Sequence, residues 1–509
     1  MAVIAQPAHF AAPVGGWNAL DAIAAMPATD AVRLDNLFPE TSYLRLRRGS
    51  QTWGGLGGNP VRSLMTFAHS TLGDRLLAAS NGTLYDQTNP LAAVPIGTGA
   101  GDRWEYVNFS TPAGQFWVAV NGNAQQFYWN GSGTITAGVN TQGPLLSHIP
   151  AWSMITAFQS RLFFAGTTDL YLYYLPVNVL QGEVHGIDLG SYFVLGGQIA
   201  FLGTWTRDDS TLGMNDLLVI GTTHGEIIVY RGVDPDDPSN WFMVGRFETG
   251  RPVSGHRQLC RLGPDMMLVN EDGFQGLANY LAMGESKALT SAISRKIGNA
   301  VTAAVRVGRD FEGWCAILYP TKNALWVNVP QTDGTYQQYV VNTITGSWCR
   351  FIGLQAICWT LAFGRLFFGT NNGLVVQADV GGNDDGRPIA FDLCTSFQVF
   401  ANIMQQKRAT MVRPFIIASG QWHPAMDVNT DYTLTDIFSP VAVDSYETAW
   451  DQFNWDQANW ASSGTPQHYW YSVQGIGTAF AIRMTGVAMS AQLQLMALDL
   501  TYEAAIGFV

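Results

Sequence analysis

Short runs of alternating apolar and polar residues fill most of the chain, separated by Asn, Asp, Gly and Thr. Such alternation predicts β-strands with one buried face, and the separating residues favour turns. One pair of strands recurs with nearly the same text, most clearly at residues 74–85, 160–171 and 364–375. A fourth copy covers residues 215–230, and looser copies cover 115–128, 265–277 and 323–341. The pattern therefore predicts an all-β protein built on a repeated β-hairpin.

The spacing of these hairpins indicates a particular all-β architecture. Asn81-Gly82 and Asn372-Gly373 supply the positive φ angles that a tight hairpin turn requires. The copies start roughly 40 to 60 residues apart, a period typical of four-stranded propeller blades. We therefore expect a β-propeller with six or seven irregular blades. A generic sandwich with many hairpins is the alternative, although sandwiches do not usually repeat the same hairpin text.

The chain changes character at the Gly/Asp-rich stretch 381–386, which predicts a linker or an exposed turn. Longer strands without the hairpin text follow it. We therefore expect the β-propeller over residues 61–385 and an appended β-sandwich-like platform domain over residues 386–509. Residues 1–60 are expected to form an N-terminal arm that packs on the platform or on a neighbouring subunit.

Two short helices are also expected, both as packing elements. Residues 18–25 begin with Asn18, a good N-cap, and end before Pro27. Residues 286–301 carry Leu289, Ile293 and Ile297 at helical spacing.

Composition adds a hint about assembly. Hydrophobic residues make up 47% of the chain and charged residues only 13%, about half the usual share. A surface with few charges suggests burial against other subunits. The formal net charge of −12 argues against a tight, sequence-independent nucleic-acid binder, but it allows a channel through which DNA slides. The five cysteines are expected to be reduced, and no secretory signal or membrane-spanning run is expected.

Candidate chemistry is sparse. The chain carries no HExxH, GxSxG, Walker or dinucleotide-binding motif, so we expect no enzyme, no catalytic residues, no metal site and no cofactor. The acidic stretches 234–237 and 384–385 have carboxylates that can hold calcium, but solvated turn acids are the simpler interpretation.

Two local patterns are candidate contact sites. Tryptophan recurs every five residues in the stretch 450–460, where Trp450, Phe453, Trp455 and Trp460 are candidates for docking a partner or a sugar face. The alternative is a loop that covers a local apolar core. A basic group of Arg45, Arg47 and Arg48 is a candidate contact for an adaptor protein or DNA, with a solvated strand edge as the alternative.

Several segments stand in a distinctive order along the chain. Residues 26–39 hold Asn36 and Pro39 in an N-x-x-P segment, and Arg47-Arg48-Gly49 follows. Further segments are 160–166, 203–227, 289–301, 341–351, 450–460 and the closing strands up to residue 503. In this order they resemble a known family: the tail hub or nozzle proteins of short-tailed double-stranded DNA phages, once called packaged-DNA stabilisation proteins. Residues 26–39 are similar to the opening of such proteins, and Arg48 stands where many members have Pro.

The resemblance implies a structural virion protein. It implies a propeller with a platform domain, of which typically six copies form a ring that extends the DNA channel below portal and adaptor proteins. It also implies that the ring retains packaged DNA, lets DNA pass non-specifically through its lumen and docks tail fibres or spikes. The expected location is the virion tail, after assembly in the host bacterial cytoplasm, with no stable membrane insertion.

Two other functions remain open on the residues alone. The Trp-rich stretch also suits a carbohydrate- or receptor-binding propeller, an adhesin. A propeller glycosidase would need two carboxylates facing one cleft, and the sequence does not identify such a pair.

Overall fold

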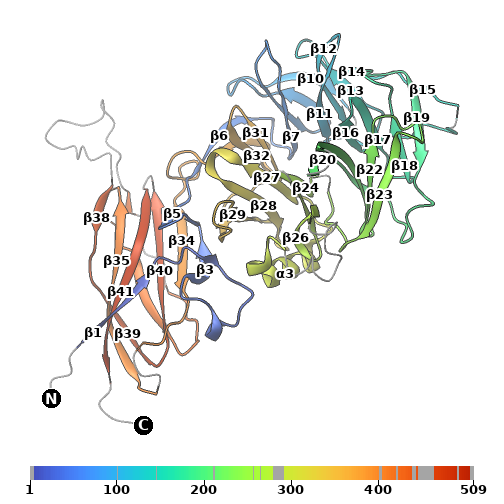
Figure 1. The fold of residues 1–509 in the computed structure, drawn as a ribbon. Helices are drawn as coiled ribbons and strands as arrows, with labels where there is room; N and C mark the ends of the chain where they lie inside the picture. Colours follow the sequence, from blue (N-terminus) through green and yellow to red (C-terminus); the bar gives the residue numbers. More distant parts are fainter. Residues whose placement is uncertain are drawn as a thin grey trace.

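The computed structural model consists almost entirely of β-strands. Six small sheets stand round a ring in one half of the molecule, and a two-layered sandwich forms the other half (Figure 1). No described helix is long and apolar enough to span a membrane. The structure describes residues 5–99, 101–144, 146–209, 213–255, 257–263, 265–278, 292–400, 404–419, 422–437, 443–444, 464–489 and 492–504.

The ring is a β-propeller, which confirms the expected fold class. The first small sheet contains β7 (Val61–Phe67), β8 (Arg75–Ser80), β9 (Thr83–Asp86) and β10 (Val94–Thr98). The second contains β11 (Glu105–Thr111), β12 (Gly114–Val120), β13 (Phe127–Trp129) and β14 (Thr136–Ala137). The third contains β15 (Thr141–Gln142), β16 (Met154–Phe158), β17 (Arg161–Ala165), β18 (Tyr171–Tyr174) and β19 (Glu183–Asp188).

The remaining sheets continue round the ring. The fourth contains β20 (Ile199–Asp209), β21 (Gly213–Thr222), β22 (Glu226–Gly232) and β23 (Trp241–Glu248), and the fifth β24 (Leu259–Leu262), β25 (Asp265–Asn270) and β26 (Gly273–Gly276). Next come four strands that belong to a larger, ten-stranded sheet: β27 (Cys315–Tyr319), β28 (Ala324–Pro330), β29 (Tyr336–Asn342) and β30 (Trp348–Ile352). The sixth small sheet contains β31 (Cys358–Ala362), β32 (Arg365–Gly369), β33 (Leu374–Ala378) and β6 (Ser50–Gly55).

The last small sheet closes the ring with strands from two distant parts of the chain. β6 pairs antiparallel with β33, so that Gln51 lies opposite Gln377. β6 falls within residues 1–60, which are expected to form the N-terminal arm, but it is the fourth strand of this propeller sheet. On its other side, this sheet packs against β7 of the first sheet through Val61, Leu64 and Phe367. The two ends of the propeller sequence are thereby held together.

Buried clusters between neighbouring sheets hold the ring together. Met65 and Phe67 of the first sheet pack with Trp117 of the second. Between the second and third sheets, Trp152 stacks on Phe164 with ring centroids 4.0 Å apart. Tight hairpins bring the strands back, as at Asn81 and Gly82, whose φ angles are +51° and +70°. The repeated hairpin sequence therefore specifies both the strands of a blade and the apolar residues that pack against the next blade.

The sandwich consists of a seven-stranded sheet packed on one end of the ten-stranded sheet (Figure 1). The seven strands are β1 (Gln6–Ala11), β4 (Leu37–Pro39), β5 (Leu44–Leu46), β35 (Lys407–Ala418), β38 (Thr465–Gln467), β39 (Tyr471–Gly477) and β41 (Leu493–Ala504). The opposing strands are β2 (Gly16–Trp17), β3 (Asp30–Asp35), β34 (Ile389–Thr395), β36 (Ala425–Thr430), β37 (Val443–Asp444) and β40 (Phe480–Met489). Leu498 and Leu500 share the buried core with Phe391 and Ile482.

Helices are short, and both helix predictions need correction. Residues 18–25 hold only a 3₁₀ turn, η1 (Ile23–Ala25), and no residue from 19 to 25 is buried. Without an apolar face to bury, so short a segment lacks the packing that stabilises a helix. The second helix starts later than predicted: the 3₁₀ turn η3 (Arg295–Ile297) leads into α3 (Gly298–Gly308), and residues 279–291 lie outside the described part. A third 3₁₀ turn, η4 (Pro320–Lys322), joins β27 to β28.

One strand joins the propeller to the sandwich. β3 pairs antiparallel with β34, where Leu34 lies opposite Leu393, and its last residue Asp35 lies opposite Arg350 of β30. The ten-stranded sheet is therefore continuous from the ring into the sandwich. We refer to the contact of β3 with β30 and β34, together with the residues that follow β3, as the joint.

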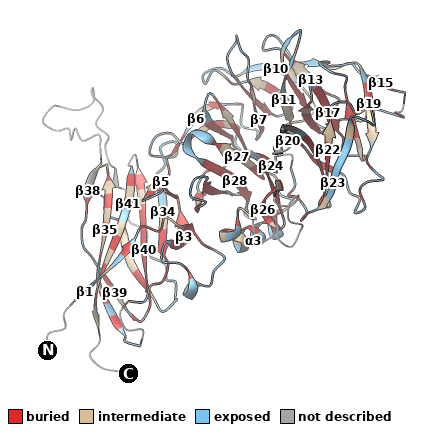
Figure 2. Cartoon of the chain, viewed as in Figure 1, coloured by how far each residue is buried: buried red, intermediate tan, exposed pale blue. Residues whose placement is uncertain are grey.

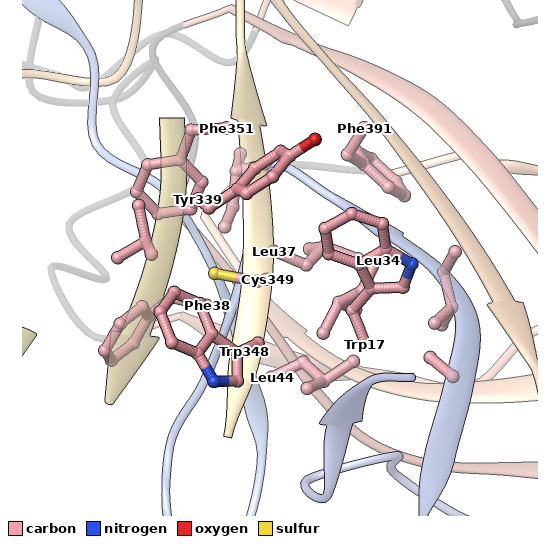
Figure 3. Packing of buried hydrophobic residues seen from close by; sticks show 14 of the residues in the cluster. Trp17, Leu34, Leu37, Phe38, Leu44, Tyr339, Trp348, Cys349, Phe351 and Phe391 are labelled. Atoms are coloured by element: carbon pink, nitrogen blue, oxygen red, sulfur yellow. The ribbon is translucent and has the colours of Figure 1, made fainter. Parts of the chain in front are cut away.

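Aromatic packing and an ion pair consolidate the joint. Arg350 donates two hydrogen bonds of 2.7 Å to the carboxylate of Asp35. The same guanidinium lies 5.5 Å from the ring centroid of Trp17, which packs edge-on against Tyr339 at 5.3 Å. Figure 3 shows these rings beside Trp348 in one buried cluster, which contains residues from both bodies. The joint is thus a hydrophobic core rather than a linker.

Asn36, directly after β3, connects four segments at the joint. Its side-chain oxygen accepts hydrogen bonds from Arg47 Nε at 2.8 Å and from the backbone N–H of Ile352 at 2.9 Å. Its side-chain nitrogen donates to the carbonyl of Ala390 at 2.7 Å. Its φ is +59°, a conformation that Asn tolerates better than most residues because its short polar side chain bonds locally.

This geometry predicts the order of two substitutions. Asn36→Ala should lower the free energy of unfolding by about 3 kcal/mol. It leaves buried N–H donors without an acceptor, and Ala tolerates the positive φ at this position less well than Asn. Asn36→Gly should cost about 1 kcal/mol less than Asn36→Ala, because Gly relieves the backbone strain while losing the same hydrogen bonds. Thermal or urea unfolding of the two purified variants measures the difference. Equal losses would show that the positive φ contributes nothing.

Candidate functional site

The two sequence-predicted contact sites have different outcomes. The stretch 450–460, with Trp450, Phe453, Trp455 and Trp460, lies outside the described residues, so its proposed docking role stays a prediction. In the basic group, Arg45 lies in β5, and Arg47 and Arg48 follow it before β6, close to the joint.

Arg47 is committed to the interior of the protein. Its side chain is only 2% exposed, and its guanidinium pairs with Asp384 at 2.5 Å. It also donates to Asn36 and to the backbone carbonyl of Ile352. The prediction that Arg47 contacts DNA or an adaptor is therefore wrong in this structure, because buried acceptors within the chain occupy the side chain.

Arg45 and Arg48 lie on the rim of a hollow of about 420 Å³ beside the joint, which Lys322 also lines. Arg45 donates to Glu40 at 3.0 Å and lies over the ring of Phe38. Arg48 is exposed. Burial raises the pKa of the Asp379 carboxyl. The nearby cations Lys322, Arg45 and Arg48 offset part of this rise. Of the three arginines, only Arg48 is exposed, and a contact of the group with an adaptor or DNA stays a prediction.

The acidic stretches are used within the fold. Asp234 pairs with Arg161 at 2.8 Å, and Asp236 accepts a hydrogen bond from the hydroxyl of Tyr174 at 2.5 Å. Asp385 accepts from the hydroxyl of Thr52 at 2.7 Å. Within the described ranges, no three His, Cys, Asp or Glu side chains gather closely enough to hold a metal ion. The acids of the two stretches therefore bond to side chains of the fold, and Asp384 pairs with the buried Arg47, so they are not simply solvated turn acids.

A pocket that the sequence does not predict lies at one mouth of the propeller. It measures about 90 Å³, and Trp104, Trp314 and Cys358 contribute to its wall. The charged groups that line it are Arg62, Arg103, Glu105, Arg257, Asp310 and Glu312. The lining residues, charged and uncharged together, lie at or near the starts of β7, β11, β24, β27 and β31, all innermost strands of their sheets. No local motif marks them, because only closure of the ring brings five separate strand starts together.

The sandwich presents an apolar outer face. Met411 and Phe415 of β35, Ile476 of β39 and Met496 of β41 point away from the sandwich core. Pro466, Ile417 and Phe415 help to line a shallow hollow of about 390 Å³ on this face. Arg413 lies over the ring of Phe415 at 4.7 Å and pairs with Asp499 at 2.7 Å. We call this surface the outer sheet face; His468 borders it beside the ring of Phe415, and Trp470 borders it beside Arg413.

Comparisons with known proteins identify no relative. No family model matches the chain, and no curated protein matches it. Among solved structures, the crystal structure of Saccharomyces cerevisiae Sqt1 aligns with 66% of this chain and 99% of its own, at 10% identity and a TM-score of 0.39. A likeness that weak carries no argument about this protein, so the propeller assignment rests on its own sheet topology.

Two substitutions in the basic group test whether Arg47 stabilises the fold while the exposed Arg48 does not. Arg47→Gln should lower the free energy of unfolding by about 3 kcal/mol, because it leaves Asp384 largely buried without its cation. Arg48→Gln, at an exposed position in the same segment, should change stability by less than about 0.5 kcal/mol. Denaturant unfolding of both variants measures this. A destabilisation by Arg48→Gln as large as that by Arg47→Gln would contradict the assignment.

Proposed function

We propose that this chain is a structural subunit of a homo-oligomeric phage tail nozzle. In this proposal a ring of copies, six in the resembled family, extends the DNA channel below the portal and adaptor proteins. The ring retains packaged DNA and docks tail fibres or spikes. The chain acts as a structural protein of the virion, without catalysis.

The observation that carries this proposal is the outer sheet face. Contiguous exposed apolar patches are uncommon on soluble monomers and usually mark a contact with another molecule. Met411, Ile476 and Met496 are between 38% and 64% exposed. Three charged groups on the face, Arg413, Asp499 and His9, are paired with one another, which lowers the cost of burying them against another subunit.

The position of the resemblance motifs agrees with the proposal. Asn36 and Pro39 of the first motif lie at the joint or directly after it, and Trp348, Arg350 and Phe351 of a later motif lie opposite on β30. A propeller fixed to its platform by a core suits a subunit that must present the same surfaces in every copy of a ring. The low charge fraction and the net charge of −12 also suit an assembled wall that does not retain DNA by phosphate contacts.

Mass photometry and negative-stain microscopy of the purified chain test the proposal. We expect a closed ring of copies, with interfaces of more than about 1,000 Å² each. The double variant Phe415→Glu, Met496→Glu should shift the population to monomers, because it places two charges on the outer sheet face. The matched control is Leu91→Glu, which changes a 94% exposed leucine in the connection between β9 and β10 of the propeller and should leave the ring intact.

Two outcomes would contradict the proposal. A wild-type chain that stays monomeric at high concentration, also when mixed with tail components, would argue against any nozzle. A ring that survives the double variant would remove the outer sheet face from the interface.

The second candidate function is a receptor- or carbohydrate-binding propeller, favoured by the outermost strand of the fourth sheet. β23 exposes Phe242, Met243 and Val244 in succession, and it is coloured largely as exposed in Figure 2. Its neighbours Tyr192 and Val194 are exposed as well. Glycan-array binding by the Phe415→Glu, Met496→Glu monomer that disappears on Phe242→Asp would favour this function over the nozzle.

A further inference from the structure

The pocket at the propeller mouth, called the propeller-mouth pocket below, is lined by three arginines and three carboxylates. At its rim, a single carboxylate serves two cations: Glu312 pairs with Arg62 and, at 3.2 Å, with Arg103. The other rim acid, Asp310, accepts a hydrogen bond from Arg309, whose side chain also pairs with Glu271 outside the pocket. Arg62 and Arg103 therefore share one carboxylate, and the second rim carboxylate is engaged by a different arginine.

Deeper in the pocket, Arg257 and Glu105 face each other without a close bond. Arg257 Nε lies 3.8 Å from the carboxylate of Glu105, which is beyond hydrogen-bonding distance. Arg257 Nη1 donates to the carbonyl of Trp359 at 2.9 Å. Its Nη2 is buried and donates to no group in the described structure. A buried guanidinium nitrogen without an acceptor is costly, so this position calls for one.

Glu105 supplies a second donor. Burial raises the pKa of Glu105 from its usual 4.5 to about 7, and Arg257 offsets only part of this rise. The other titratable or charged groups near this pair are Tyr106, Cys315, Cys358, Arg62, Arg103 and Glu312. Below neutral pH, Glu105 therefore carries a proton, which removes one negative charge and provides an O–H donor beside Arg257.

We propose that the propeller-mouth pocket binds a small oxyanion, a carboxylate or sulfate-like group, with Arg257 as its main ligand and Arg62 and Arg103 at the entrance. The volume of about 90 Å³ accommodates one such group or a few waters, so the ligand is either a small anion or the acidic end of a larger molecule. The inference is independent of the nozzle assembly, because it rests on residues of the propeller alone.

Isothermal titration of the full-length chain with sodium sulfate and with sodium acetate, at constant ionic strength, tests the proposal. Neither anion titrates between about pH 6 and pH 8, so any pH dependence arises from the protein. We expect saturable binding of one equivalent per chain of at least one of the two anions. A preference between them distinguishes a tetrahedral from a planar group.

Arg257→Met should weaken that binding by about tenfold or more, as loss of a charge-assisted hydrogen bond predicts. The matched control Arg365→Met, at an exposed arginine on β32 outside the pocket, should bind like the wild type.

The pH profile provides a readout that does not depend on Arg257→Met folding. Binding should weaken as pH rises through about 7, because Glu105 loses its proton and then repels the anion. Glu105→Gln keeps the shape and a donor without the charge, so it should bind at about pH 8 as tightly as the wild type binds at about pH 6. The absence of saturable binding of either anion to the wild type at about pH 6 would overturn the proposal and leave a pocket filled by water only. Binding unchanged by both Arg257→Met and Glu105→Gln would overturn it as well.

Discussion

The pairing of Asp35 with Arg350 is the contact on which the arrangement of this molecule depends. It lies where β3 leaves the sandwich sheet and meets the propeller strand β30, so one sheet runs through both bodies. Two parallel hydrogen bonds give such a pair direction as well as strength. The surrounding aromatic core, from Trp17 to Tyr339, excludes water and leaves no flexible segment at this point.

Several features become understandable once the joint is fixed. The N-terminal segment supplies β1 to β5 to the sandwich and β6 to the propeller, so it forms part of both bodies. The outer sheet face then points in a constant direction relative to the propeller. A repeated assembly needs such constancy, because each copy must present the same surface at the same angle to close a ring. The propeller-mouth pocket lies away from this face and can bind a ligand without disturbing it.

The sequence predicts what is local in this structure and misses what is not. Hairpin turns such as Asn81-Gly82 and the alternating strands around them are encoded within a few residues, so the propeller and its approximate blade number follow from the text. The placement of β6 in the last propeller sheet depends on pairing with β33, more than 300 residues away in the chain, and no local pattern signals it. Arg47 looks like its exposed neighbour Arg48 in the sequence, and only the fold buries it against Asp384. The pocket around Arg257 likewise exists only when distant strand starts converge.

The rigid joint is the central claim, and a distance measurement tests it most directly. Spin labels at Leu91→Cys on the propeller and Ile476→Cys on the sandwich occupy exposed positions, whereas all five native cysteines are buried. Double electron–electron resonance, on labelled chains diluted with unlabelled chains, reports the distance between the two bodies. We predict one narrow distance distribution. A broad or bimodal distribution would contradict the account, because it would show that the propeller and the sandwich move independently.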